Sequence, residues 1–300
     1  IHRSAVDLVI QAPAKLNLFF EVLAKRCDGY HEIETLMCPI DLYDTLHFQE
    51  DPNGELELRC RRVFGASGPC GRGLGEVPEG PKNLVMQAVE LVRRRSGVCR
   101  GAKLRLVKRI PAAAGLGGGS SDAAAALVAA NEGWRLGRSR EELAHWAAEL
   151  GSDVPFFLAG GPAICRGRGE RVTPLTGLGE LHFVVVRPPA GLSTAAVYGA
   201  CRAAEQPQTV WPLVEALRQG DWKQAAARLL NRLQPAAEAL SPWVKRLQQE
   251  FAQLDFLGYG MSGSGTSYFG LCRHARQARR SARRLEAYSL GSVFAARSCR

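Results

Sequence analysis

The sequence lacks the patterns that would place the chain in a membrane or outside the cell. No apolar run approaches the roughly 18 residues that a membrane-spanning helix needs, and no charged segment followed by an apolar one opens the chain. The nine cysteines are an odd number with no C-x-x-C pair and no cysteine/histidine ligand spacing, which argues against a disulfide framework and against a zinc site. We therefore expect a cytoplasmic protein with free thiols.

Motifs of several common enzyme classes are also absent. The chain has no G-x-x-x-x-G-K-[ST] phosphate loop and no G-x-S-x-G nucleophile motif, so neither a P-loop enzyme nor an α/β-hydrolase is indicated. G-x-G-x-x-G does occur at Gly258, Gly260 and Gly263, but strand-like residues follow it where a dinucleotide-binding fold requires a helix. We therefore do not interpret this match as a dinucleotide site.

The composition is that of a folded protein with excess positive charge. At 300 residues and 46% hydrophobic, the chain can bury about three quarters of its unfolded surface and divide into two lobes. A net charge of +10 favours polyanionic partners, from nucleic acids to phosphorylated small molecules. The arginine-rich residues 273–284 are either the solvated face of a helix or a nucleic-acid patch. The lack of interleaved aromatic residues favours the solvated face.

Alternating polar and apolar residues predict one strand of special interest. Over residues 15–25, apolar side chains alternate with Lys15, Asn17 and Glu21, which predicts a strand with a polar working face. By contrast, residues 61–80 are rich in glycine and show no periodicity, so we expect a long mobile loop there.

Capping and turn residues predict further elements of the N-terminal part. Two alternating stretches within 45–60, joined by turn residues, predict a β-hairpin. Helices are expected over 83–97 and over 139–151, the second opening with an S-x-x-E capping box. Strands are expected over 102–110 and within 161–172.

A second set of predicted strands and helices follows residue 176. Strands at 181–188 and 266–272 enclose a predicted helix at 193–205 and further helices. The sequence thus predicts an α+β chain of two domains, 1–175 and 176–300.

A glycine-rich segment stands between the predicted strand at 102–110 and the helix that follows it. Residues 111–122 read PAAAGLGGGSSD, with four glycines in five positions. Glycine permits positive φ and close approach of a ligand, and the following helix start offers unpaired N–H groups and a positive dipole end. A flexible linker or an ordinary tight turn would need only one or two glycines. The segment therefore favours a phosphate cradle.

The segment resembles the nucleotide-binding motif of the GHMP kinases, the family of galactokinase, homoserine kinase and mevalonate kinase. Residues 12–44, 150–170 and 261–269 are similar to further motifs of one branch of this family, in the expected order, so the resemblance spans essentially the whole chain. The element R-x-D-G-Y-H, at 26–31, is far more specific than the glycine segment. The resemblance implies a two-lobed α+β fold with mixed and antiparallel sheets and an active site in the cleft between the lobes.

The function that this resemblance implies is an ATP-dependent small-molecule kinase, with Mg²⁺ accompanying ATP. The alcohol would be a cytidine diphosphate-linked methylerythritol, phosphorylated on its 2-hydroxyl in the non-mevalonate route to isoprenoids. Neither nucleic acid nor membrane is an expected partner. The metal ligands and the oligomeric state are not predicted.

Lys15 and Asp153 match the catalytic pair of the family. There an aspartate activates the substrate hydroxyl, and a lysine beside it stabilises the carboxylate and the moving phosphoryl group. Phosphoryl transfer needs chiefly positioning, charge neutralisation and a base within reach of the hydroxyl, so these residue types suit the reaction. Asp153 could instead simply cap the helix that begins at Val154. Asn17, two residues from Lys15 on the same strand face, is expected to point into the same cleft.

The resemblance also assigns the nucleotide site. The glycine segment would hold the phosphates, and two earlier residues the adenosine end, although Lys108 could equally be a solvated strand residue. The residues so assigned are Asn83, Lys108, Pro111, Gly115, Leu116, Gly117, Gly118, Gly119, Ser120 and Ser121.

The substrate site follows in the same way. Tyr30 and His31 match positions that hold a cytosine ring, and Tyr198 resembles the aromatic residue on its opposite face, unless it is a core tyrosine. Gly263 lies in a G-S-G-T turn that either lines the cleft or forms a plain tight hairpin.

Two other functions deserve comparison with this one. A GHMP kinase for an alcohol without a base, such as mevalonate, would have no use for Tyr30 and His31. A nucleotide-sensing or nucleic-acid-binding protein on this fold would have no need of both Lys15 and Asp153. Departures from the family pattern occur at Ala113, usually glycine, and at 231–234, which read N-R-L-Q in place of N-D-L-E. The second departure puts local hydrogen bonds in doubt.

Overall fold

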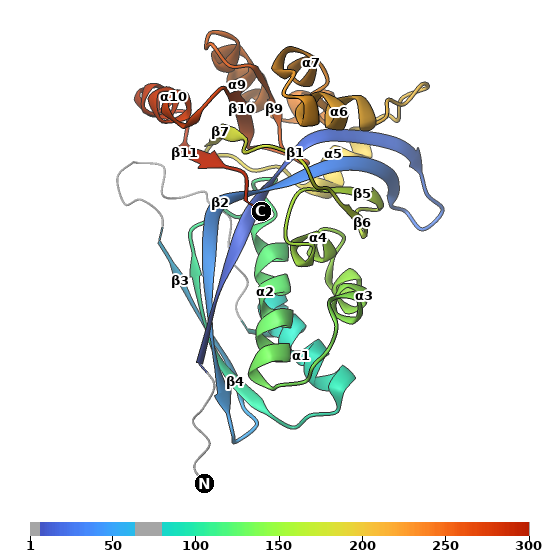
Figure 1. Ribbon diagram of the computed structural model, residues 1–300, viewed down its shortest axis with the longest axis vertical. Helices are drawn as coiled ribbons and strands as arrows, with labels where there is room; N and C mark the ends of the chain where they lie inside the picture. Colours follow the sequence, from blue (N-terminus) through green and yellow to red (C-terminus); the bar gives the residue numbers. More distant parts are fainter. Residues whose placement is uncertain (1–6, 64–79, 300) are drawn as a thin grey trace.

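Two β-sheets organise the computed structural model, which describes residues 7–63 and 80–299 (Figure 1). The first sheet has seven strands in the order β3-β4-β2-β1-β8, with β5 paired to β2 and β6 to β5. Its strands are β1 (Asp7–Lys25), β2 (His31–Asp51), β3 (Leu56–Arg62), β4 (Gly101–Lys108), β5 (Ala163–Gly167), β6 (Arg171–Pro174) and β8 (Leu230–Asn231). The second sheet is antiparallel, in the order β11-β7-β10-β9. Its strands are β7 (His182–Arg187), β9 (Gly258–Met261), β10 (Tyr268–Cys272) and β11 (Ser292–Arg297).

The helices fall into two groups (Figure 1). One group packs beside the first sheet and comprises η1 (Gly80–Lys82), α1 (Leu84–Ser96), α2 (Gly118–Gly133), α3 (Arg140–Leu150) and α4 (Val154–Leu158). The other surrounds the second sheet and comprises α5 (Thr194–Ala200), α6 (Trp211–Gln219), α7 (Trp222–Ala227), α8 (Gln234–Leu240), α9 (Pro242–Ala252) and α10 (Ala275–Ala287). The predicted α+β fold with mixed and antiparallel sheets is confirmed.

The predicted β-hairpin within 45–60 is wrong. The turn is present, since the backbone N–H of Asn53 donates to Asp51 Oδ1 at 2.8 Å. However, β4 lies between the two strands, antiparallel to β2 and parallel to β3. The local turn was predicted correctly. The pairing of strands, however, depends on the whole sheet, and β4, which separates β2 from β3, follows α1 in the sequence.

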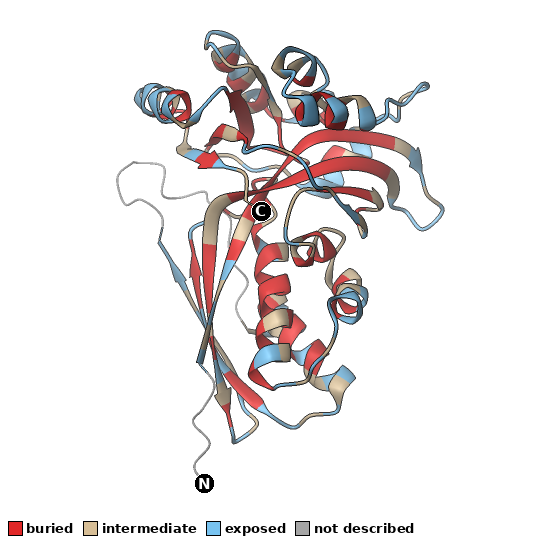
Figure 2. Cartoon of the chain, in the orientation of Figure 1, coloured by how far each residue is buried: buried red, intermediate tan, exposed pale blue. Residues whose placement is uncertain are grey.

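The strand predicted over 15–25 forms the second half of β1, but it is not one-sided. Lys15, Asn17 and Glu21 are all buried, because packed elements cover both faces of β1 (Figure 2). Leu16 and Leu18 belong to the core cluster that includes side chains of the second sheet. The polar side chains on this strand therefore need partners inside the protein.

The capping predictions are confirmed. Asn83 caps α1 by accepting from the N–H of Val85, and Gly97 ends the helix at φ 67°. The capping box of α3 is complete in both directions. The predicted helix at 193–205 is shorter than expected, since α5 ends at Ala200.

Alanine allows α2 to lie close to its neighbours. Seven of the residues from 123 to 130 are buried, most of them alanines, where α2 packs against α1 and β1 (Figure 2). These contacts hold α2, the helix that follows the glycine segment, in place against its neighbours.

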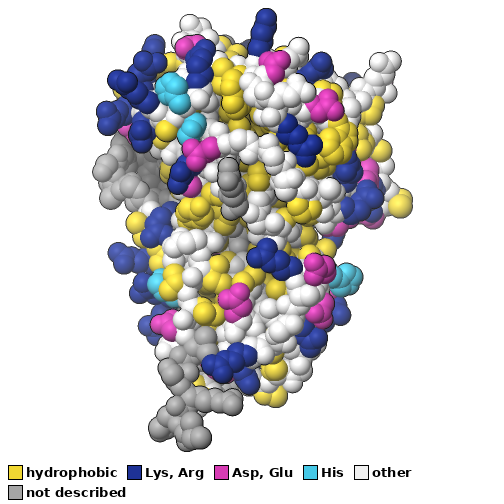
Figure 3. Space-filling model, in the orientation of Figure 1, with side chains coloured by type: hydrophobic (Ala, Val, Ile, Leu, Met, Phe, Trp, Pro, Cys, Tyr) yellow, Lys and Arg dark blue, Asp and Glu magenta, His cyan; other side chains and the backbone are white. Residues whose placement is uncertain are grey.

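The arginine-rich segment forms α10, with its arginines on the outer surface (Figure 3). Most of the predicted loop at 61–80 lies outside the described residues. None of the helices among the described residues combines the length and the apolar composition that a membrane span requires. The division into 1–175 and 176–300 stays a prediction, and β8 of the second part pairs with β1 of the first.

Candidate active site

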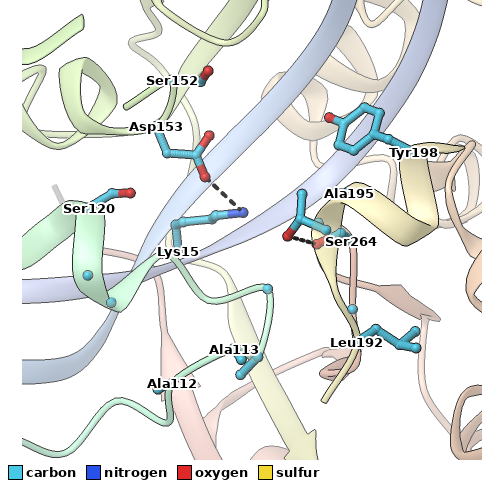
Figure 4. Close-up of a pocket in the computed structure, with 18 of the residues that line it drawn as sticks. Lys15, Ala112, Ala113, Ser120, Ser152, Asp153, Leu192, Ala195, Tyr198 and Ser264 are labelled. Atoms are coloured by element: carbon cyan, nitrogen blue, oxygen red, sulfur yellow. Dashed lines mark hydrogen bonds and ion pairs between the residues drawn. The ribbon is translucent and has the colours of Figure 1, made fainter. Parts of the chain in front are cut away.

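A cleft of about 1080 Å³ joins most of the residues that the sequence singled out (Figure 4). Its lining comes from the glycine segment, the first turn of α2, the loop before α4, the loop before β2, α5 and the β9–β10 turn. Of the predicted site residues, the lining includes Lys15, Tyr30, His31, Asn83, Lys108, Pro111, Gly115, Gly117, Gly118, Gly119, Ser120, Asp153, Tyr198 and Gly263.

Lys15 and Asp153 form an ion pair at the cleft. Lys15 Nζ lies 3.6 Å from Asp153 Oδ2, and the lysine side chain is 4% exposed against 31% for the aspartate. Asp153 does occupy the N-cap position of α4, but its side chain makes no capping hydrogen bond. Its carboxylate instead faces Lys15 and the open cleft (Figure 4).

Asn17 holds Lys15 from behind. Lys15 Nζ donates to Asn17 Oδ1 at 2.5 Å, and Asn17 Nδ2 donates to Thr35 Oγ1 at 2.9 Å. The backbone N–H of Asn17 donates to Ser262 Oγ at 3.2 Å. Asn17 is buried and is not part of the cleft lining, so its position suits orientation of the ammonium rather than the predicted substrate contact.

Two glycines bring the loops of both sheets together around Lys15. Gly115 has φ 73°, and a Cβ there would lie 2.2 Å from the carbonyl oxygen of Ser262. Gly263 has φ 57°, and a Cβ there would lie 3.2 Å from Lys15 Nζ. Both positions require a backbone that approaches its neighbours without a side chain. Gly263 thus lies in the turn of the β9–β10 hairpin and also lines the cleft.

The start of α2 presents backbone amides to the cleft. Gly117, at φ 71°, is the N-cap of α2 and supplies no side-chain cap, so N–H groups of the first turn lack a partner from that side chain. The carbonyl of Leu116 accepts from the backbone N–H of Lys15 at 2.9 Å, which ties the loop to β1. Unpaired amides and the positive helix end together favour an anion such as phosphate.

Lys108 is not a solvated strand residue. It is 3% exposed, and its ammonium donates to the carboxylates of Asp44 and Asp122. The ammonium is therefore engaged beneath the first turn of α2, although Lys108 also lines the cleft where the adenosine end was predicted. Asn83 lines the same region while capping α1.

Aromatic rings gather at the other end of the cleft. The rings of His31 and Tyr198 lie 5.1 Å apart between centroids with a 31° tilt. Tyr30 is 49% exposed, and the guanidinium of Arg168 lies 5.0 Å from its ring centroid. Tyr198 also packs edge-on against Phe20, so it both packs and lines the cleft.

Burial shapes the protonation of these groups. Burial, followed by the charge of Lys25, lowers the pKa of His31 below its usual value. A neutral imidazole with one donor and one acceptor is thus favoured at pH 7. Burial, followed by the Asp153 carboxylate, raises the pKa of Tyr198, which keeps its phenol protonated.

The sequence prediction included three residues that the cleft lining does not contain, Asn17, Leu116 and Ser121, and it did not name several residues that do line the cleft, Arg168 and Asp122 among them. The Leu116 side chain belongs to the core, and Ser121 is 1% exposed and outside the lining. Arg168 and Asp122 line the cleft but were not proposed. Arg168 stood within the quoted 150–170 motif, whereas Asp122 looked like an ordinary polar residue of a helix start.

The departure at 231–234 has a local explanation. Arg232, where the family pattern has aspartate, donates to the Glu21 carboxylate through Nε at 2.7 Å and a terminal nitrogen at 2.9 Å. Glu21 is fully buried, so this guanidinium supplies a charge partner that the interior requires. Burial raises the pKa of Glu21, but the Arg232 contacts and backbone N–H groups outweigh it and lower the pKa overall.

We expect Arg232→Ala to lower the free energy of unfolding by roughly 2–4 kcal/mol, because Glu21 would stay buried without its ion-pair partner. Denaturant unfolding monitored by circular dichroism measures the change. Arg59→Ala removes an exposed ion pair with Glu57 and should change stability by less than about 1 kcal/mol. Equal losses in both variants would contradict the importance of the buried pair.

Comparison with known proteins identifies the family. Residues 83–161 match the model of the GHMP kinases N terminal domain, and residues 213–289 match that of the GHMP kinases C terminal domain. A 4-diphosphocytidyl-2-C-methyl-D-erythritol kinase of Pelotomaculum thermopropionicum is 45% identical over 91% of this chain and 92% of its own. The chain belongs to the 4-diphosphocytidyl-2-C-methyl-D-erythritol kinase family.

Solved structures agree with membership in the 4-diphosphocytidyl-2-C-methyl-D-erythritol kinase family. A crystal structure of 4-(cytidine 5'-diphospho)-2C-methyl-D-erythritol kinase matches with a TM-score of 0.80 at 35% identity, covering 98% of this chain and all of the other. A mevalonate kinase of L. major matches with a TM-score of 0.75 at 18% identity, covering 99% of this chain and 98% of the other, and shows the shared fold alone. The family and the two-lobed GHMP kinase fold expected from the sequence are confirmed.

Proposed function

We propose that this cleft transfers the terminal phosphoryl group of ATP to the 2-hydroxyl of 4-diphosphocytidyl-2-C-methyl-D-erythritol, with Asp153 as the base. The chain is a phosphotransferase of the methylerythritol phosphate route to isoprenoids, as its family membership implies. The main support for these roles is the ion pair of Lys15 and Asp153, which lies between the glycine segment and the aromatic end of the cleft.

Each part of the cleft has a task in this reaction. The amides from Gly115 to Ser120 bind the triphosphate, and Lys15 lies at the loop so that its charge can neutralise the transferring group. Asp153 accepts the proton of the attacking hydroxyl. Gly117 packs against the Lys15 side chain, with its would-be Cβ 3.0 Å from Lys15 Cγ, which keeps loop and lysine in contact.

The aromatic end of the cleft supplies specificity for a base. Tyr30 offers an exposed ring, Tyr198 a second ring, and neutral His31 a donor and an acceptor for the polar edge of cytosine. A planar base held in this way places the attached erythritol toward Asp153.

Magnesium accompanies ATP in this proposal. Within residues 7–63 and 80–299, no group of three or more histidine, cysteine or acidic side chains could hold a metal ion. We expect Mg²⁺ to be bound mainly through phosphate oxygens and water, as is usual for Mg²⁺ in phosphoryl-transfer sites. The free thiols of the described cysteines suit the cytoplasmic location that we also propose.

The test of this function is ADP release with ATP and a panel of alcohols. We expect turnover with 4-diphosphocytidyl-2-C-methyl-D-erythritol and none with mevalonate, homoserine or 2-C-methyl-D-erythritol 4-phosphate. The last compound is the matched control, because it carries the same alcohol without the base. Turnover of mevalonate, or equal turnover with and without the cytidine, would refute the assigned substrate.

A further inference from the structure

Three buried charged side chains meet behind the glycine segment at the start of α2. Lys108 Nζ donates to Asp122 Oδ2 at 2.6 Å and also to Asp44 Oδ2. Asp44 Oδ1 accepts from the backbone N–H groups of Arg109 and Ile110. All three side chains of this triad are 5% exposed or less. One ammonium thus serves two carboxylates, and the triad would carry a net negative charge with both of them ionised.

Asp122 is the member of the triad that belongs to α2, the helix whose start lines the proposed nucleotide site. It lies in the first turns of α2 and lines the cleft together with Gly117, Gly118, Gly119 and Ser120. Among the described residues, its Oδ1 has no hydrogen-bond partner. A buried carboxylate oxygen without a donor is unfavourable, and protonation removes that cost.

The other charged groups near α2 do not cancel the rise in the pKa of Asp122. Burial is the largest influence on Asp122 and raises its pKa; Lys108 on β4 lowers it and Asp44 on β2 raises it, with a net value of about 7. Glu90 of α1 and Glu142 and Glu149 of α3 form ion pairs with arginines at the surface. The remaining charged groups facing this part of the cleft are Lys82 before α1, Lys15 on β1 and Asp153 before α4.

We propose that Asp122 binds a proton from solvent when ATP occupies the loop, so that a neutral carboxylic acid lies beneath the phosphates. The inference rests on the nucleotide site of the proposed function. Phosphates bring negative charge to the cleft beside Asp122, and a like charge disfavours the carboxylate. The protonated acid removes that repulsion and gives Oδ1 or Oδ2 a hydrogen to donate.

The sign of the pH effect follows from this linkage. Below pH 7 the free protein already carries the proton, and ATP binds without proton uptake. Above pH 7 the free protein has lost it, and binding must recover it, so affinity falls as pH rises. If ATP raises the pKa of Asp122 by about one unit, binding weakens about fivefold between pH 6 and pH 8.

Calorimetric titration with a non-hydrolysable ATP analogue tests the inference. The parent protein and Asp122→Asn are titrated from pH 6 to pH 8 in two buffers of different ionisation enthalpy. Ionisation of the nucleotide itself is common to both proteins. We expect the parent to lose about fivefold more affinity than the variant over this range, and to take up protons near pH 8 that the variant does not. Equal pH slopes and equal proton uptake would overturn the proposal.

Asp44→Asn is the second variant, in case Asp122→Asn does not fold. Its amide oxygen can still accept from Arg109 and Ile110, but one negative charge of the triad is gone. Lys108 then serves Asp122 alone, so the fall in affinity should begin at a lower pH than in the parent. An unchanged profile would count against the proposal. Absence of analogue binding at every pH would refute the nucleotide site itself, whereas binding with no Asp122-dependent proton would refute this inference alone.

Discussion

Replacing Asp153 with asparagine is expected to reduce kcat at least about a hundredfold. Asparagine keeps the size of the side chain and its position before α4, but its amide cannot accept the proton of the attacking hydroxyl. The loss should fall on kcat, with the KM for ATP nearly unchanged, because the proposed function assigns the phosphates to the glycine segment and Lys15, which line the cleft, rather than to Asp153. Steady-state ADP release measures both constants.

Asp221→Asn is a matched control for this variant. Asp221 also stands at a helix N-cap, before α7, and its side chain accepts from the N–H of Gln224 at 3.0 Å. Asparagine caps helices about as well as aspartate, so activity and stability should both be preserved. A parent-like kcat in Asp153→Asn would remove that residue from the mechanism.

Gly115→Ala is the second large effect that we expect. The new Cβ would lie 2.2 Å from the Ser262 carbonyl oxygen, on a residue at φ 73°. The strained backbone conformation alone costs about 1–2 kcal/mol, and the clash with rigid backbone adds to it. The loop must move away from the β9–β10 turn, and the KM for ATP should rise at least about tenfold together with a lower thermal midpoint.

Gly119→Ala isolates the geometric cause. It lies in the same glycine run, but its φ is not positive and a Cβ would meet only Leu84 Cδ1 at 3.6 Å, an ordinary contact. The thermal midpoint should therefore change little. If both variants behaved alike, the close approach between Gly115 and Ser262 would not be what shapes the loop.

Local signals in the sequence predicted what local physics decides. The caps of α1 and α3 depend on residues within one turn of each other, and both are formed as expected. The positions of Lys15 and Asp153 in the cleft could be predicted only through the family resemblance, because no local sequence signal near either residue indicates that the two side chains are in contact. Their separation of 3.6 Å is a property of the folded sheet and of α4.

Nonlocal pairings are what the sequence could not show. Asp44 lies 64 residues from Lys108 in the chain and Lys108 lies 14 from Asp122, and each alone is compatible with a solvated surface position. Nothing in the sequence near Arg232 indicates that its partner is Glu21, which the fold places beside it. In each case a buried charge has a partner that only the fold supplies.

The insertion of β4 between β2 and β3 has a consequence during synthesis on the ribosome. Leu56 of β3 pairs with Ala102 of β4, so a nascent chain exposes unpaired strand edges until residues 101–108 have emerged. Such edges invite pairing with other chains and hence aggregation. The arginines at 59, 61 and 62 on β3 place positive charge along that edge, where mutual repulsion between nascent chains opposes it.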